Sequence, residues 1–194
     1  PASQELGLFL EVTPIWATQA KVDYHQDVLW HYANSAFLSG YTVEERKVLI
    51  DDAFAKFKEI FGDYPQSVGA WHIDAKSLEY MQKKYALIGA LICADQFLTD
   101  NYQIWGGWWG VPYYPSRFNV LMPAQSKRNK LQVVIFQWAA RDPLNGYGSG
   151  VQESTFSVQA NDYLKHHLTT DYFSKLIDIY LNPSMGKFGQ VTVG

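Results

Sequence analysis

Apolar residues along the chain alternate between short continuous runs and stretches with helical spacing. The continuous runs predict buried strands over residues 6–12, 67–71, 87–94, 131–138 and 188–194. Thr13-Pro14 ends the first run, because proline has no N–H to donate to a strand ladder. Runs that are apolar on both faces are typical of a parallel sheet that helices cover.

Helical spacing fills the stretches between these runs, and its clearest example starts at a capping box. Thr42 and Glu45 can satisfy each other's backbone donors, which predicts a helix that begins after Thr42 and ends at Gly62. Its inward face is expected at Ile50, Ala53, Phe54, Phe57 and Phe61. Asp74 can cap a second helix over residues 75–85. Two further patterns predict helices over residues 25–38 and 159–181.

Strands that alternate with helices predict an α/β fold, here a parallel sheet of about five strands with flanking helices. A complete eight-stranded (β/α) barrel typically needs about 250 residues, so a chain of 194 residues predicts an incomplete or fragmentary barrel. We expect one α/β domain over residues 1–194, alone or as part of a larger barrel, with a Trp-rich loop at residues 96–125. The chain begins at Pro1 rather than methionine, which suggests a processed protein or an excised piece.

Composition and charge narrow the function classes. With 47% hydrophobic residues the chain is expected to fold, and its net charge of −3 with scattered Lys and Arg argues against nucleic acid as a partner. No apolar run is long enough for a membrane span. Cys93 is the single cysteine and lies in an apolar run, which predicts a buried thiol and excludes an internal disulfide. The histidines show no metal-binding spacing, so no metal or cofactor is expected.

Polar and aromatic residues follow the predicted strands. The carboxyl ends of parallel strands meet at one edge of a sheet, where α/β proteins carry their sites. Each residue also has a structural explanation; Asp74, for example, is as readily a helix cap. As a group they favour a site at this edge: Glu11, Trp71, His72, Asp74, Asp95, Gln96, Asp100, Gln137, Trp138, Arg141 and Asp142.

The segment over residues 100–115 contains more aromatic residues than an ordinary surface loop. Aromatic planes stack on the C–H faces of sugar rings, so a carbohydrate cleft is favoured over a hydrophobic plug or a dimer contact. The expected substrate-binding side chains are Trp71, His72, Gln96, Asp100, Trp105, Trp108, Trp109, Tyr113, Tyr114, Trp138 and Arg141.

Glycoside hydrolysis requires two carboxyl groups, one that protonates the leaving oxygen and one that attacks or activates water. The candidates at strand ends are Glu11, Asp95 and Asp142, with Asp100 in the aromatic segment. We expect the first three to be catalytic.

Residues 42–62, followed by 64–71, place a helix, a proline and a strand with a functional end in succession. Residues 84–95 lead into a strand that ends at Asp95. These segments resemble the polysaccharide-deacetylase-like superfamily, whose (β/α) barrels include α-mannosidase-like and amylase-like glycoside hydrolases. The deacetylase signature of two aspartates and its HxxxH metal pair are absent, so the resemblance implies the glycoside-hydrolase side. It points first to Asp95 and second to Glu11 as functional residues.

Three functional hypotheses remain open from the sequence. The first is a glycoside hydrolase that acts on a poly- or oligosaccharide through paired carboxylates in an aromatic-lined cleft. The second is a non-catalytic carbohydrate-binding or assembly domain, and the third is a polysaccharide deacetylase fragment without its metal motifs. A carbohydrate-active chain would favour a secreted or cell-envelope location. An open sheet edge would tend to pair with another copy, which leaves a homo-oligomer open.

Overall fold

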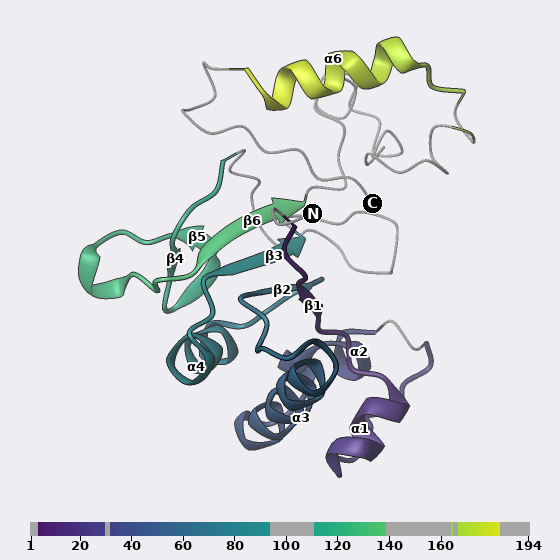
Figure 1. The fold of residues 1–194 in the computed structure, drawn as a ribbon, viewed down its shortest axis with the longest axis vertical. Coiled ribbons are helices and arrows are strands. Elements are labelled where there is room, and N and C mark those ends of the chain that lie inside the picture. The colour runs from purple at the N-terminus through teal and green to yellow at the C-terminus, as the bar shows by residue number, and fades with distance from the viewer. Residues whose placement is uncertain (1–3, 30–31, 94–110, 139–163, 165–166, 183–194) are drawn as a thin grey trace. The chain divides into compact units, whose positions relative to one another are not determined.

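The computed structural model describes residues 4–29, 32–93, 111–138, 164 and 167–182 (Figure 1). The chain divides into two compact units. The first comprises Pro1–Ile92 and Tyr113–Ile135, and the second comprises Cys93–Pro112 and Phe136–Gly194. The boundary between the units falls near the carboxyl ends of two strands, between Ile92 and Cys93 and between Ile135 and Phe136.

The sheet consists of four parallel strands in the order β1-β2-β3-β6. They are β1 (Leu8–Phe9), β2 (Ser67–Ala70), β3 (Gly89–Cys93) and β6 (Val134–Trp138). Each lies inside one of the first four predicted apolar runs, so those predictions are confirmed with shorter bounds. The fifth run, residues 188–194, lies outside the described residues. The predicted α/β class with a parallel sheet is confirmed.

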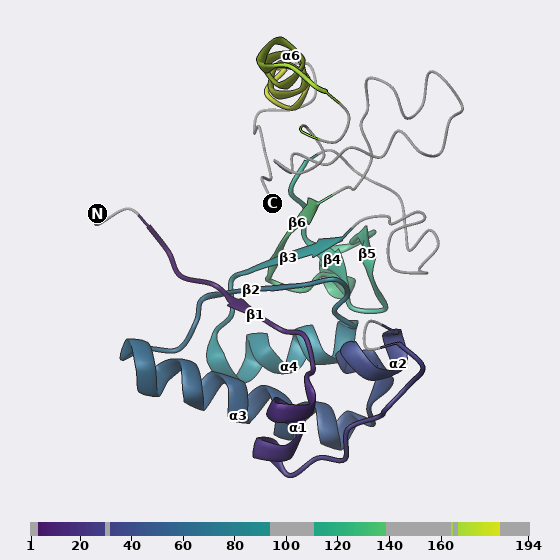
Figure 2. The same cartoon turned by 90° about the vertical axis from the view of Figure 1, so that its right-hand side faces the viewer.

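The strands follow one another across the sheet in chain order, and the helices of the first unit share one face. Figures 1 and 2 both show α1, α2, α3 and α4 on the same side of β1, β2 and β3. A doubly wound sheet reverses its strand order and places helices on both faces. Within the described part of the first unit, β1, β2 and β3 follow the chain order and their helices lie on one face, unlike in a doubly wound sheet.

The two best-marked helices begin and end where their local signals predict. Helix α3 (Val43–Phe61) starts at the capping box, in which Thr42 Oγ1 accepts from Glu45 N at 3.3 Å and Glu45 Oε2 accepts from Thr42 N at 2.8 Å. Gly62 follows with φ 92°, a left-handed conformation that glycine adopts at low cost. Helix α4 (Ala75–Tyr85) starts at Asp74, which accepts from the backbone of Lys76 and Ser77.

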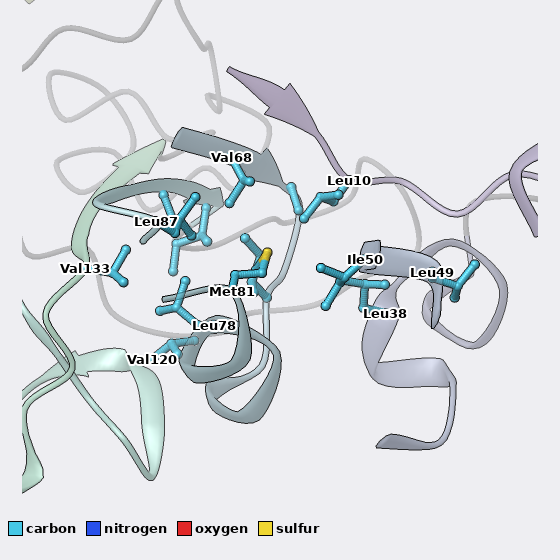
Figure 3. Close-up of a cluster of buried hydrophobic side chains, with 14 of the residues drawn as sticks. Leu10, Leu38, Leu49, Ile50, Val68, Leu78, Met81, Leu87, Val120 and Val133 are labelled. Atoms are coloured by element: carbon cyan, nitrogen blue, oxygen red, sulfur yellow. The ribbon is translucent and has the colours of Figure 1, made fainter. Parts of the chain in front are cut away.

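The core of the first unit lies between these helices and the sheet. Figure 3 shows Leu78 and Met81 of α4 among Val68 of β2, Leu87 and Val133. The predicted inward positions Ile50, Phe54 and Phe57 of α3 are buried, while Phe61 is 54% exposed, so its predicted burial is wrong. The last turn of α3 leaves the core, and Leu49 is buried instead. Cys93 is buried, as predicted.

Residues 13–41 differ most from the prediction. Pro14 starts helix α1 (Pro14–Ala20), because Thr13 caps it by accepting from Trp16 N at 3.2 Å and proline suits the first helical turn. The helix predicted over residues 25–38 is absent from its described part, which instead holds a short α2 (Ala33–Ala36) and a 3-10 turn, η1 (Leu38–Gly40).

Tertiary contacts at His25 explain this difference. The His25 ring stacks on Tyr41 with centroids 4.3 Å apart, and Nδ1 lies 2.9 Å from the Gly40 carbonyl oxygen. The Ser35 hydroxyl donates to the His25 carbonyl oxygen at 2.6 Å. These contacts satisfy in an extended segment the polar groups that a helix would have paired.

The predicted loop at residues 96–125 contains regular structure in its described part. An antiparallel hairpin joins β4 (Pro115–Ser116) to β5 (Asn119–Pro123), and a 3-10 turn, η2 (Lys127–Asn129), follows it.

The second unit contains α6 (Thr170–Tyr180), which confirms part of the helix predicted over residues 159–181. Helix α6 begins at Thr170 because Thr169 is an extended N-cap that accepts from Tyr172 N at 3.3 Å, and His167 shortly before it has φ 53°.

Candidate active site at the carboxyl edge of the sheet

Glu11 and Trp71 come together just beyond the carboxyl ends of β1 and β2. The register pairs Phe9 with Gly69, and two further residues along each strand bring Glu11 level with Trp71. The Trp71 indole Nε1 donates to Glu11 Oε2 at 2.9 Å, although the two residues are 60 positions apart. Both side chains are half-buried. The structure therefore joins two of the residues that the sequence analysis selected.

Burial of the flanking residues decides which way Glu11 points. Leu10 and Val12 are each 2% exposed and belong to the core, so the intervening side chain points to the other face of the strand. The backbone is held on both sides of Glu11: Leu10 N donates to Gly69 O at 2.7 Å, and Val12 N donates to Ala36 O at 2.9 Å. The carboxylate thus stands on a fixed backbone, on the face of the sheet opposite the helices.

An aromatic contact positions the Trp71 ring from the same face. Phe9 meets Trp71 edge-on, with ring centroids 6.4 Å apart and planes at 86°. The Phe9 ring also lies over Gly69, where a Cβ atom would come within 3.2 Å of Phe9 Cδ2. Glycine at this position therefore leaves room for Phe9, which in turn supports the indole. Sequence reasoning did not select Phe9 or Gly69. Each lies two positions before a selected residue, Glu11 or Trp71, and this spacing places it on the same face of its strand.

His72 follows Trp71 and lies half-buried against Phe37, with ring centroids 6.3 Å apart. Burial lowers the pKa of His72 below 6.5; the Asp74 carboxylate opposes this shift and the Arg46 guanidinium adds to it. The imidazole is therefore neutral at pH 7, and one ring nitrogen donates while the other accepts.

Arg46 connects the helices behind His72. Its Nη1 lies 3.1 Å from Asp74 Oδ1, its Nε donates to the Tyr41 carbonyl oxygen at 2.7 Å, and its Nη2 donates to the Ser39 carbonyl oxygen at 3.2 Å. Asp74 is also the N-cap of α4, so the structural explanation given for it is confirmed. Arg46 escaped the sequence analysis because it lies in the first turn of α3, away from any strand end.

Tyr113 and Tyr114 do not reach this edge by any contact seen in the described residues. Tyr113 is 8% exposed, its hydroxyl donates to the Val120 carbonyl oxygen at 2.8 Å, and its backbone pairs with Ile135. Burial raises its pKa. Tyr114 is 43% exposed and lies beneath Lys130, with Nζ 4.3 Å from the ring centroid. Tyr113 packs the hairpin against β6, while Tyr114 faces solvent.

The remaining predicted site residues cannot be placed in this geometry. Trp138 is the last residue of β6, and its side chain is not among those described; Gln137 beside it is 4% exposed. The other predictions lie outside the described residues: Asp95, Gln96, Asp100, Trp105, Trp108, Trp109, Arg141 and Asp142.

Two further properties concern the described residues alone. Among them, no three His, Cys, Asp or Glu side chains are grouped so that they could hold a metal ion. No helix in the described ranges is both long and apolar enough to cross a membrane.

The fold and this edge define an α/β protein with a four-stranded parallel sheet, flanking helices and a carboxylate–indole pair at its carboxyl edge. The chain belongs to the family described as "Domain of Unknown Function with solved-structure structure (DUF3863)", whose model matches residues 20–167. No curated protein matches the chain.

One solved structure resembles part of the chain. It is the crystal structure of "a putative glycoside hydrolase/deacetylase" from Parabacteroides distasonis, with 21% sequence identity and a TM-score of 0.41. The match covers 51% of this chain and 23% of that one, so this chain spans less than a quarter of its neighbour's length.

Proposed function

We propose that this chain is a carbohydrate-active domain, a glycoside hydrolase acting on a poly- or oligosaccharide, with Glu11 as one of its two catalytic carboxylates. The observation that supports it most is the hydrogen bond from Trp71 Nε1 to Glu11 Oε2 at the carboxyl edge of the sheet. An isolated structural carboxylate needs no such arrangement, since it would be solvated or paired with a cation.

The hydrogen bond suggests which of the two roles Glu11 has. The indole N–H only donates, so it holds Oε2 as an acceptor and fixes the orientation of the carboxyl group. We assign this oriented group the role of nucleophile or general base of glycoside hydrolysis rather than that of proton donor. Because Oε2 is engaged by Trp71, Oε1 is the oxygen that would act on the sugar or on water.

Neighbouring groups would complete a sugar subsite. Trp71, held by Glu11, and His72, whose burial keeps its pKa low, are the proposed sugar-contacting side chains at this edge. Asp95 and Asp142 follow the predicted strands and are the proposed sources of the general acid. Trp105, Trp108 and Trp109 are proposed to line the cleft.

The test compares Glu11→Gln with the matched variant Glu5→Gln, an exposed residue just before β1. Release of reducing ends would be measured on a panel of polysaccharides, and thermal unfolding would show that each variant folds. Loss of a catalytic carboxylate should lower turnover by about 10²-fold or more, because general acid–base groups contribute about that much. Glu5→Gln should match the parent protein.

Two outcomes would contradict the proposal. Full activity in Glu11→Gln would remove Glu11 from the reaction. Sugar binding without turnover by the parent protein would instead support the non-catalytic carbohydrate-binding alternative.

A further inference from the structure

The hairpin region carries a local excess of positive charge. Residues 111–133 contain Arg117, Lys127, Arg128 and Lys130 and no acidic residue, whereas the whole chain has a net charge of −3. We call these four side chains the basic hairpin cluster. A positively charged surface on a chain whose net charge is negative is a candidate binding site for an anionic partner.

The fold brings the four cations together from two segments. Arg117 lies in the turn between β4 and β5, and its backbone N–H donates to the Asn129 carbonyl oxygen at 2.8 Å. Ser116 pairs with Lys130 across an isolated bridge. The turn at Arg117 therefore lies beside η2, which carries Lys127 and Arg128.

Exposed aromatic rings accompany these charges. Phe118, next to Arg117, is 76% exposed, and Tyr114 is 43% exposed beneath the Lys130 ammonium. Among the described residues, the acidic group that meets the cluster is Glu79, whose Oε1 lies 3.7 Å from Arg117 Nη2. Lys127 and Arg128 are exposed. The cluster thus presents cations and ring faces side by side to solvent.

The cluster lies far from the carboxylate–indole pair along the strand direction. Val134 N donates to Ile88 O at 2.8 Å, which places the start of β6 beside the start of β3. Figure 1 shows the hairpin extending from this amino edge, away from the arrowheads of β3 and β6. Glu11 and Trp71 are at the opposite, carboxyl edge, so the cluster is a separate surface.

We propose that the basic hairpin cluster binds an anionic polysaccharide, one whose sugars carry carboxylate or sulfate groups. This inference rests on the proposed carbohydrate function and specifies the class of polymer. Arg and Lys pair with the anionic groups, while the exposed Phe118 offers a plane for a sugar ring between them. Four cations on a chain of net charge −3 are few for a phosphate backbone, which argues against nucleic acid.

The experiment measures migration of the full chain in native gels that contain polygalacturonate, chondroitin sulfate or neutral dextran. The test variant replaces the cluster: Arg117→Gln, Lys127→Gln, Arg128→Gln and Lys130→Gln. The matched control makes the same charge change at exposed lysines elsewhere: Lys21→Gln, Lys56→Gln, Lys58→Gln and Lys76→Gln. Circular dichroism checks that both fold, and Phe118→Ser serves as a second test that leaves every charge in place.

The parent protein should be retarded by one or both anionic polymers and not by dextran, and added salt should weaken the binding. The cluster variant should bind at least about tenfold more weakly, since each ion pair contributes a modest increment and four are lost. The control should stay within about twofold of the parent, and Phe118→Ser should also bind more weakly.

Equal binding by the cluster variant and the control, or no retardation of the parent, would overturn the proposal. Stronger binding to single-stranded DNA than to either polysaccharide would overturn it too. Failure of this binding experiment would not contradict the proposed catalytic role of Glu11. Conversely, anionic polymer binding without turnover would oppose the hydrolase proposal while supporting this one.

Discussion

Asp51 of α3 joins the two long helices that cover the sheet, and its replacement should destabilise the protein measurably. Its Oδ1 accepts from the Tyr80 and Tyr85 hydroxyls at 2.7 and 2.6 Å, and its Oδ2 accepts from Lys84 Nζ at 2.6 Å. All three donors belong to α4. The Asp51 carboxylate therefore joins α3 to the second half of α4 through three hydrogen bonds.

The magnitude follows from the exposure of these groups. Hydrogen bonds to a charged group contribute about 1.5–3 kcal/mol when buried, but the Asp51 and Lys84 side chains are 37% and 45% exposed. Taking about 1 kcal/mol for each tyrosine bond and about 0.5 kcal/mol for the exposed ion pair, Asp51→Ala should lower the unfolding free energy by about 2–3 kcal/mol. Asp51→Asn keeps an acceptor for the tyrosines and should cost about 1 kcal/mol.

Urea unfolding followed by circular dichroism measures these differences. Asp52→Ala is the matched control, because neighbouring Asp52 accepts from the Gln19 side chain, at 3.1 and 3.4 Å, and from no other group among the described residues; this variant should change stability by less than about 0.5 kcal/mol. The reasoning is refuted if Asp51→Ala is no more destabilising than this control.

The effect should also depend on pH. Burial opposes ionisation of Asp51, but hydrogen bonds from Lys84, Tyr85 and Tyr80 outweigh it and hold its pKa below the usual 3.8. A carboxyl group whose folded pKa is depressed stabilises the protein above its unfolded pKa and loses that contribution as pH falls through the folded value. The gap between the parent protein and Asp51→Asn should therefore be full at pH 7 and shrink in acid below about pH 4.

Further predictions concern single side chains. Trp16 has a buried indole Nε1 without a hydrogen-bond partner among the described residues. Trp16→Phe removes this unsatisfied donor, which favours folding, but also removes part of the packed ring, which disfavours it. The unfolding free energy should therefore change by less than about 1 kcal/mol. Gly69→Ala should displace Phe9 and cost about 1–3 kcal/mol in urea unfolding, whereas an unchanged midpoint would contradict the close contact. NMR titration should give His72 a pKa below 6.5, and this pKa should rise in Arg46→Gln, which removes a neighbouring positive charge. Because the unfolded chain then binds a proton more readily than the folded one, His72 should reduce the stability of the protein as pH falls below its unfolded pKa.

Much of the first unit was predictable because its signals are local. The four apolar runs became β1, β2, β3 and β6, and the capping box at Thr42 started α3, since both depend on residues a few positions apart. The pairing of Glu11 with Trp71 was partly accessible as well. The carboxyl ends of parallel strands meet at one edge of the sheet, so Glu11 and Trp71 were both predicted to lie at that edge.

Other features depended on partners that are distant in the chain. Arg46 reaches Asp74 only after α3 and α4 have packed, and residues 13–41 follow contacts of His25 with Gly40 and Tyr41 rather than their own helical pattern. The basic hairpin cluster likewise forms because Arg117 meets Asn129 across the turn.

The sequence by itself determined the four strands of the sheet, the helices α3 and α4, and the edge at which Glu11 and Trp71 meet, because periodicity and capping act over a few residues. The tertiary structure alone decided which oxygen of Glu11 meets the indole and whether Tyr113 faces solvent or the core. These depend on register and on burial against distant segments, and a shift of one residue would turn every such side chain to the opposite face.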